Sequence, residues 1–372
     1  MGPVVEPSEL DTVTSNGARL GAGRASVIRR RRGQLPGTRH RRGAGVARDN
    51  LKGLGHMIAS RLFIIAVAVV ALSALMFWLA DLSPFDPLAH YLGADYGRLT
   101  PQQRAEVASS IGVDGTWYQQ WLRWASRALT GDLGYSRVYS RPVAQVFAER
   151  LPWTLLLSAV GLTIMTLLAL ALGVTAALRP RGLVDRSVVG LGVFIAATPS
   201  YVYALGTVLV FAIWLRAIPV GGAGPIGASP TLAAAGPYLV APALVLAVSQ
   251  LSWPLLAVRE ATMEARTSDA VAAARARGLG RGTILWRHVA PMAVMPLVTL
   301  VGGRLGELVV GAVIVETVFL WPGLAQATVE SAVALDFPLL AILTVATTLV
   351  VMCGSLIADL CYMFIDPRVS DV

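Results

Sequence analysis

The sequence is poor in charged side chains, in lysine and in cysteine. Asp, Glu, Lys and Arg together make up 14% of the 372 residues, whereas soluble domains carry about 25%. Lys52 is the single lysine, and Gly53 follows it. A P-loop needs a lysine followed by serine or threonine, because the ammonium group binds the phosphates and the hydroxyl binds magnesium. The chain is therefore not expected to hold such a nucleotide site.

Motifs of catalysis and metal binding are also missing. The two cysteines, Cys353 and Cys361, lie in one apolar run, which favours packing over a disulfide framework or a metal site. The four histidines are scattered, and the sequence has neither a HExxH helix nor a Ser-His-Asp order in a polar domain. We therefore expect no enzymatic activity, no catalytic residue, no metal site and no cofactor in this chain.

The sequence does contain long apolar runs. Hydrophobic residues make up 55% of the chain, and several stretches reach the ~20 residues that cross a bilayer core about 30 Å thick. Six spans are predicted, at about 60–80, 152–178, 187–215, 237–258, 291–315 and 338–364. The first follows a basic flank but lacks a signal-peptide cleavage site, so we expect it to be retained. The predicted fold class is all-α integral membrane, with six transmembrane helices.

The formal charge of +9 is concentrated near the N-terminus, where twelve Lys or Arg residues lie between Arg19 and Arg61. Gly, Ala, Pro and Ser surround them, a composition that cannot bury a core. Residues 1–52 are therefore predicted to be a disordered, arginine-rich cytoplasmic tail. This tail would either fix the topology as a solvated arm or attract anionic lipid headgroups. No nucleic-acid partner is expected.

The loops between the spans predict the orientation. Arginine is frequent in 179–186 and 259–290, whereas the loops that follow the third and fifth spans hold one arginine between them. Short loops rich in arginine remain in the cytoplasm, so both termini are predicted to be cytoplasmic. The loop at 82–150 exceeds the ~60 residues to which this rule applies. We expect it to form an extracytoplasmic helical subdomain between a first transmembrane helix at 53–81 and a five-helix transmembrane core at 151–369.

The cytoplasmic loop at 259–290 is rich in alanine and arginine and is predicted to form a helix-turn-helix. Its glycine at 278 can adopt the left-handed conformation that ends a helix. The small alanine side chains would leave a smooth surface for a partner protein, flanked by positive charge. The candidate docking residues are Ala272, Ala273, Ala274, Arg275, Arg277, Gly278 and Leu279. A second interpretation is that this basic amphipathic loop lies on lipid headgroups.

Short motifs along the chain resemble one family. Residues 274–279 read ARARGL, and the other motifs, in order, are Ser83–Pro87, Gly131–Ser136, Glu149–Pro152, Thr198–Ser200, Ile218–Gly222, Val315–Phe319, Trp321–Gly323 and Asp366–Arg368. In this order and spacing they resemble the permease subunits of ABC-type importers, in the dipeptide, oligopeptide and nickel branch and of the first-permease type. The resemblance covers roughly residues 55–369. Ala272, His288 and Ala290 depart from the wider family's Glu, Ile and Leu.

The resemblance implies a type I importer architecture, in which 259–290 is the coupling loop. It implies four kinds of partner: a second permease subunit, two ATP-binding cassette subunits that bind ATP and magnesium, an extracytoplasmic substrate-binding protein, and membrane lipid. The loop at 82–150 would face the binding protein. The implied location is the bacterial plasma (inner) membrane, with several passes.

Ionisable side chains inside predicted spans are candidates for the translocation path, because charge at bilayer depth is costly. Arg304 and Glu307 lie three apart on one helical face, so they either line the path or form a structural ion pair. An arginine on the path would attract a substrate carboxylate. Glu316, near the outer end of the fifth span, is open between a gate and local hydrogen bonding. Asp359 is expected to be solvated or capped.

We therefore expect a permease subunit that moves di- or oligopeptides inward while ATP is hydrolysed by its partners. Nickel or another small polar cargo remains an alternative within the same architecture. An ion-coupled secondary transporter is the rival of another class, although no internal repeat is found. A structural or assembly membrane protein is the third alternative.

Overall fold

The computed structural model of the chain describes residues 42–84, 87–111, 113–225, 227, 230–303 and 305–365. The chain divides into two units, Met1–Leu54 and Gly55–Val372. Of the first unit, residues 42–54 are described, and they belong to helix α1 (Arg42–Asp81). The predicted disordered tail falls mostly on residues 1–41, outside the described residues, but its last part, 42–52, is helical.

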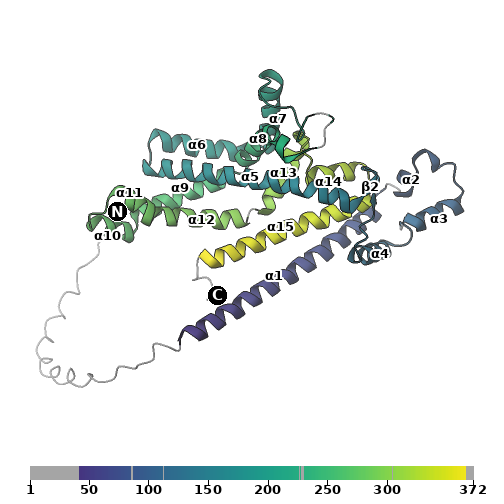
Figure 1. Ribbon diagram of the computed structural model, residues 1–372, viewed down its shortest axis with the longest axis horizontal. Coiled ribbons are helices and arrows are strands. Elements are labelled where there is room, and N and C mark those ends of the chain that lie inside the picture. Colours follow the sequence, from purple (N-terminus) through teal and green to yellow (C-terminus); the bar gives the residue numbers. More distant parts are fainter. Residues whose placement is uncertain are drawn as a thin grey trace, which may run out of the picture. The chain divides into compact units, whose positions relative to one another are not determined.

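The described residues of the second unit are mainly helical (Figure 1). The outer loop holds α2 (Pro87–Leu92), η1 (Gly93–Asp95), α3 (Pro101–Ile111), α4 (Trp117–Leu129), β1 (Tyr135–Ser136) and β2 (Arg141–Pro142). The next elements are α5 (Val143–Leu178), α6 (Leu183–Ala197), α7 (Ser200–Thr207), the π-helical η2 (Val208–Trp214), α8 (Leu232–Ser249) and α9 (Ser252–Thr267). The last are α10 (Asp269–Ala276), α11 (Arg281–Ile284), the π-helical η3 (Leu285–Val289), α12 (Ala290–Gly303), α13 (Leu305–Val318), α14 (Leu324–Val333) and α15 (Phe337–Ile365).

Within the described part of the chain, four helices are long and apolar enough to cross a membrane: Gly55–Asp81, Val143–Leu178, Leu232–Ser249 and Phe337–Ile357. A fifth span results if α6 and the α7–η2 helix, bent by 99° at Thr198-Pro199, count as one. Proline explains the bend, because it disfavours helical geometry in the residue before it. The prediction of a multi-helix membrane fold is confirmed. The predicted fifth span corresponds to α12 and α13, which flank residue 304, outside the described residues.

Two helix boundaries differ from the prediction. The predicted fourth span, 237–258, breaks at Gln250, where α8 ends and α9 begins. Pro254 lies in the first turn of α9, where its missing N–H would have no intrahelical partner. The second span begins at Val143 rather than near Pro152. Val143 and Val146 are buried against α14 and α15, and this packing extends the helix upstream of the proline.

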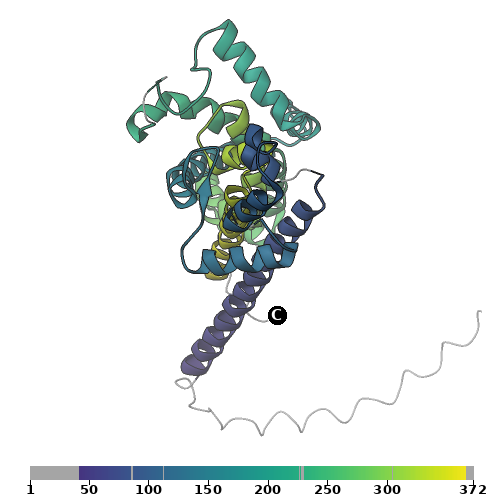
Figure 2. The ribbon, with the colours of Figure 1, turned by 90° about the vertical axis from the view of Figure 1, so that its right-hand side faces the viewer.

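The core of the second unit is organised around α5, which lies beside α6, α8 and α9 (Figures 1 and 2). Buried residues recur at nearly every fourth position of α5, so they form one stripe along the helix. They are Leu157, Gly161, Met165, Ala169, Gly173 and Ala176. A Cβ added at Gly161 would meet Leu246 at 2.9 Å, and one added at Gly173 would meet the Leu255 carbonyl at 3.0 Å. The glycines therefore permit the close approach of α8 and α9.

The outer loop is folded onto the end of α1. Helix α4 begins with a capping box between Thr116 and Gln119 and ends at Leu129, two residues before Gly131, which has a φ of +88°. Its Trp121 indole N–H donates to the Ser73 hydroxyl of α1 at 3.0 Å. One turn further along α1, Phe77 lies 5.5 Å from the ring of Trp124. The loop therefore contains ordered helices and a hairpin.

The other part of α1 is tied to α15 by one ion pair. The Arg61 guanidinium lies 2.5 Å from a carboxylate oxygen of Asp359. Asp359 was expected to be solvated or capped. Instead it forms an ion pair with Arg61, which lies on the first described helix of the chain. A charge on α15 is thus matched by a charge on α1.

Candidate functional site

The segment 259–290, which we call the arginine segment, folds as a helix-turn-helix at one end of the second unit. Helix α10 ends at Ala276 and is followed by a left-handed glycine, Gly278, with a φ of +75°. The Gly278 N–H donates to the Arg275 carbonyl at 2.9 Å, and the Leu279 N–H donates to the Ala274 carbonyl at 3.2 Å. These two bonds form a Schellman motif. The predicted role of Gly278 as the helix terminator is confirmed, and α11 begins after Gly280.

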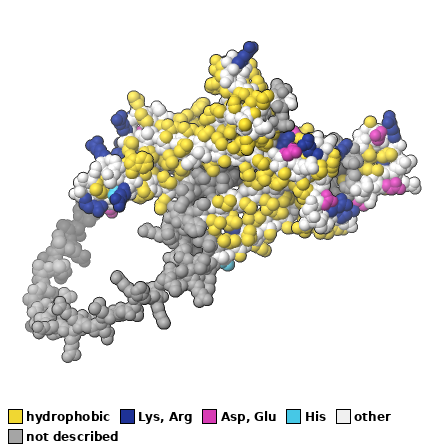
Figure 3. All heavy atoms as spheres, in the orientation of Figure 1, with side chains coloured by type: hydrophobic (Ala, Val, Ile, Leu, Met, Phe, Trp, Pro, Cys, Tyr) yellow, Lys and Arg dark blue, Asp and Glu magenta, His cyan; other side chains and the backbone are white. Residues whose placement is uncertain are grey.

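One face of the arginine segment is buried and the other is exposed. Ala265, Val271, Ala274, Ile284 and Val289 form a small apolar core. Most of the predicted docking residues are exposed: Ala272, Ala273, Arg275, Arg277, Gly278 and Leu279. Ala274 is fully buried and therefore supports this surface from inside instead of forming it. Figure 3 shows arginine side chains gathered at the end of the molecule where α10 and α11 lie.

Two arginines attach α9, and with it the arginine segment, to the neighbouring helices. Arg259 forms a two-pronged ion pair with Asp185 of α6, at 2.5 Å from Nε and 3.0 Å from Nη2. Asp185 is buried and also accepts the Arg181 N–H at 2.7 Å. Arg266 donates to the Ala177 carbonyl in the last turn of α5. From the sequence, Arg259 and Arg266 were used only to predict the orientation of the chain in the membrane. Asp185, the one acidic residue among the arginines of 179–186, was the signal that could have indicated an ion-pair partner.

A second polar cluster, the α14 junction, lies at the other end of α5. Glu316 of α13 is fully buried. One of its oxygens accepts the Thr154 hydroxyl at 2.8 Å, and the other accepts the Ala325 and Gln326 backbone N–H groups at 2.8 and 3.1 Å. These N–H groups lie in the first turn of α14 and have no partner within the helix, so the carboxylate satisfies them and matches the helix dipole.

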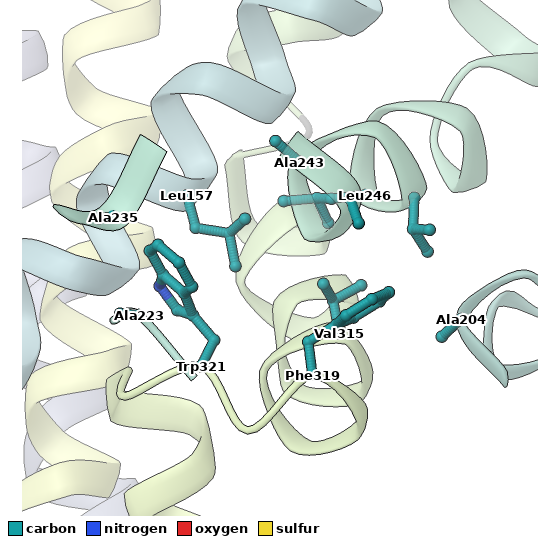
Figure 4. Packing of buried hydrophobic residues seen from close by; sticks show 11 residues of the cluster. Leu157, Ala204, Ala223, Ala235, Ala243, Leu246, Val315, Phe319 and Trp321 are labelled. Atoms are coloured by element: carbon teal, nitrogen blue, oxygen red, sulfur yellow. The ribbon is translucent and has the colours of Figure 1, made fainter. Parts of the chain in front are cut away.

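Motifs that are far apart in the sequence meet around this junction. The Gly222 N–H donates to the Phe319 carbonyl at 2.8 Å, and the Trp321 indole donates to the Trp153 carbonyl at 3.0 Å. Figure 4 shows Trp321 and Phe319 among Leu157, Val315 and Leu246. A Cβ on Gly221 would meet the Phe319 carbonyl at 2.6 Å, so a larger residue would force this loop off α13.

The β1–β2 hairpin is clamped by the acid that precedes α15. Asp336 is buried, and one oxygen accepts the Ser136 hydroxyl at 2.7 Å and the Arg137 and Val138 N–H groups at 2.9 and 3.1 Å. In the same hairpin, the Tyr139 hydroxyl donates to Glu330 of α14. Burial and this hydrogen bond raise the pKa of Tyr139 well above its usual range, so the phenol remains a donor at physiological pH.

Replacing Asp336 with alanine should release the hairpin. The buried Ser136 hydroxyl would lose its partner, which costs about 1–3 kcal/mol, so amide hydrogen exchange in residues 136–139 should accelerate about tenfold. The matched control is Asp132→Ala, which removes one exposed bond to the Gly134 N–H and should change exchange little. Equal protection in both variants would contradict the clamp.

Comparison with known proteins bears on the whole chain. Residues 169–371 match the family model described as "Binding-protein-dependent transport system inner membrane component", which is more than half of the chain. The chain belongs to this permease family. The expected resemblance is thereby confirmed, and the protein is a multi-pass membrane component of a transport system.

Individual relatives of this permease align over most of both chains. The oligopeptide transport system permease protein AppB of Bacillus subtilis is 28% identical over 303 residues, covering 81% of this chain and 95% of its own. The probable D,D-dipeptide transport system permease protein DdpB of Escherichia coli is 30% identical over 333 residues, with 84% and 97% covered. The dipeptide transport system permease protein DppB of the same bacterium is 26% identical over 335 residues, with 84% and 98% covered.

Of the predicted path residues of this permease, the structure describes the side chain of Glu316. Arg304 lies outside the described residues, and Glu307 lies in α13, in a stretch whose side chains are likewise not described. Glu316 is described, and within the described residues the hydrogen bonds of its carboxylate go to Thr154 and to α14. Of the two roles left open for Glu316, this geometry favours local hydrogen bonding. The described part of the chain contains no group of three or more His, Cys, Asp or Glu side chains arranged as a metal site.

Proposed function

We propose that this chain is the translocation subunit of an ATP-driven importer and that it moves di- or oligopeptides together with a second permease subunit. The observation that carries the proposal is the arginine segment, a helix-turn-helix with an exposed alanine and arginine face that is fastened to α5 and α6 by arginines. Three relatives that align over more than four fifths of the chain are named as oligopeptide or dipeptide permeases, which supports peptides as the cargo.

In this proposal α12 and α13 together form one span, which gives six spans and places both termini in the cytoplasm. The arginine segment is then cytoplasmic and serves as the coupling loop for two ATP-binding cassette subunits, which bind the ATP and magnesium. The attachment of α9 to α5 and α6 supports this role, because a motion imposed on the segment would be passed to three membrane helices at once. The outer loop, with α2 to α4 and the hairpin, would face a substrate-binding protein.

Co-purification tests the docking role of the arginine segment. Gly278→Pro removes the left-handed turn, because proline fixes φ near −65°, whereas Gly282→Ala adds a methyl group that meets nothing within 4 Å. We expect wild type and Gly282→Ala, solubilised in mild detergent, to bring down a second permease and ATPase subunits. Gly278→Pro should recover about tenfold less ATPase, the effect of losing about 1.4 kcal/mol of contact energy.

Uptake into intact cells or sealed vesicles, read beside the co-purification, separates the rival functions. Uptake of a labelled dipeptide that continues after the proton gradient is collapsed, while ATP is kept, supports the importer. Wild-type protein that comes out without an ATPase in several mild detergents, together with uptake that stops when the gradient is lost, would instead indicate a secondary transporter.

Arg304 remains the candidate residue that binds a substrate carboxylate on the translocation path. Glu307 would either line the path beside it or form an ion pair with it. An Arg304→Gln protein should then lose preference for substrates with a free carboxylate. Full-rate uptake with unchanged preference would leave the two residues as a structural pair.

A further inference from the structure

A cavity of about 610 Å³ lies between the end of α5 and the arginine segment. Three arginines line it, namely Arg266, Arg275 and Arg281, and the rest of its lining is aliphatic, including Leu178, Leu279 and Leu285. No acidic residue is among the lining residues. Its volume is in the range of pockets that hold small ligands. The cavity therefore combines strong positive charge with an apolar wall.

The positive charge of the cavity is largely uncompensated. Arg266 is half-buried and donates one N–H to the Ala177 carbonyl, which leaves the rest of its guanidinium for another acceptor. Arg275 and Arg281 are exposed, and within the described residues neither takes part in an ion pair. Three guanidinium groups that converge on one space repel each other unless an anion is present.

The place of the cavity at the end of α5 and its apolar wall narrow the identity of that anion. Leu178 is the last residue of α5, and the 36-residue α5 is apolar enough to cross the membrane. The cavity therefore lies at the end of a helix that can span the membrane. A ligand that matches this lining, with one anionic group and an apolar part, is a phospholipid. Basic pockets between membrane helices on the cytoplasmic side are suited to anionic headgroups, and arginine binds phosphate oxygens through two parallel N–H bonds.

We propose that this cavity is a phosphate-binding site, occupied by the headgroup of an anionic phospholipid, with the three arginines on the phosphate and the start of an acyl chain against the leucines. The site joins residues of α5, α9, α10 and α11, so a bound headgroup would hold the arginine segment against the membrane end of α5. Free phosphate shares the same chemistry and is distinguished from lipid by the experiment.

The test uses the full chain, with any subunits that purify with it, in mild detergent. Native mass spectrometry measures retention of added phosphatidylglycerol and, separately, of phosphatidylcholine. The double variant Arg275→Gln/Arg281→Gln removes two cavity arginines that are exposed, so folding should be unaffected, which a melting curve checks. The matched control is Arg277→Gln/Arg287→Gln, which removes the same charge from exposed residues of the same segment that do not line the cavity.

We expect wild type and the control to bind phosphatidylglycerol more tightly than phosphatidylcholine, and the cavity variant to bind phosphatidylglycerol about tenfold more weakly, as expected for the loss of charge-assisted bonds. Retention that millimolar inorganic phosphate does not reverse supports a lipid source. Displacement by inorganic phosphate supports the phosphate site with a soluble ligand.

Equal phosphatidylglycerol binding by the cavity variant and the control would overturn the proposal. If, in addition, the cavity variant lost co-purifying ATPase subunits, Arg275 and Arg281 would be contacts for an acidic surface of that protein. Because lipid binding and ATPase recovery are read separately, failure of the lipid site would not be confused with failure of the importer proposal.

Discussion

Glu316→Leu is expected to destabilise the protein strongly and to abolish transport. The substitution puts an apolar side chain of similar size in a fully buried position, but it leaves the Thr154 hydroxyl and the Ala325 and Gln326 N–H groups without their acceptor. A buried donor that loses its partner costs about 1–3 kcal/mol. With three donors affected, the free energy of unfolding should fall by about 3 kcal/mol or more, seen as a lower melting temperature in detergent.

Two further variants sharpen this prediction. Glu316→Gln keeps one carbonyl oxygen, which can still accept from the start of α14, so its loss should be about 1 kcal/mol, the typical net worth of a hydrogen bond. Thr317→Val, the neighbouring control, removes only an exposed bond to the Val313 carbonyl and should be close to neutral. If Glu316→Leu melted like wild type yet failed to transport, the residue would act in the gate, and the hydrogen-bonding role would be wrong.

Asp185→Ala is expected to have the second large effect. Removing one partner of a buried ion pair leaves the other charge without its counterion, which costs on the order of 3 kcal/mol. Arg259 keeps only its contact with the exposed Glu260. The melting temperature should fall, and substrate-stimulated ATP hydrolysis should fall more than recovery of the ATPase subunits, because α9 would lose its ion pair with α6 and keep only weaker contacts such as the Ser252–Gly192 hydrogen bond.

A double-mutant cycle isolates this pair from other effects. Arg259→Ala alone should cost about as much as Asp185→Ala, and the combination should cost clearly less than the sum of the two, as for residues in direct contact. Glu260→Gln is the control, because an exposed ion pair contributes about 0–1 kcal/mol. Additive losses in the combined variant would show that the two residues do not support each other.

The local features of this chain could be predicted because they depend on neighbouring residues. The apolar runs predicted the membrane helices, since every backbone group in lipid must be bonded within its own helix. Gly278 was correctly predicted to end α10, because its φ of +75° is one that glycine adopts without strain. The motifs from Ser83 to Asp366 were sufficient to indicate the permease family, which the match over residues 169–371 confirms.

Helix boundaries were predicted less well, because packing decides them. The start of α5 at Val143 depends on contacts with α14 and α15, nearly two hundred residues away in sequence. The break between α8 and α9 leaves no strong signal beyond Pro254, which also fits inside a kinked membrane helix. In both places a local proline was a weaker determinant than the tertiary contacts.

The sequence by itself determined that the chain is a helical membrane protein, where its apolar segments lie, and that an arginine segment interrupts them. Only the tertiary structure decided which charges pair: Glu316 with Thr154 and α14, Asp185 with Arg259, Asp336 with the hairpin. The partners are 162, 74 and up to 200 residues apart. Helical periodicity reports on neighbours within a few turns, whereas a buried charge takes whichever partner the packing of the helices brings within reach.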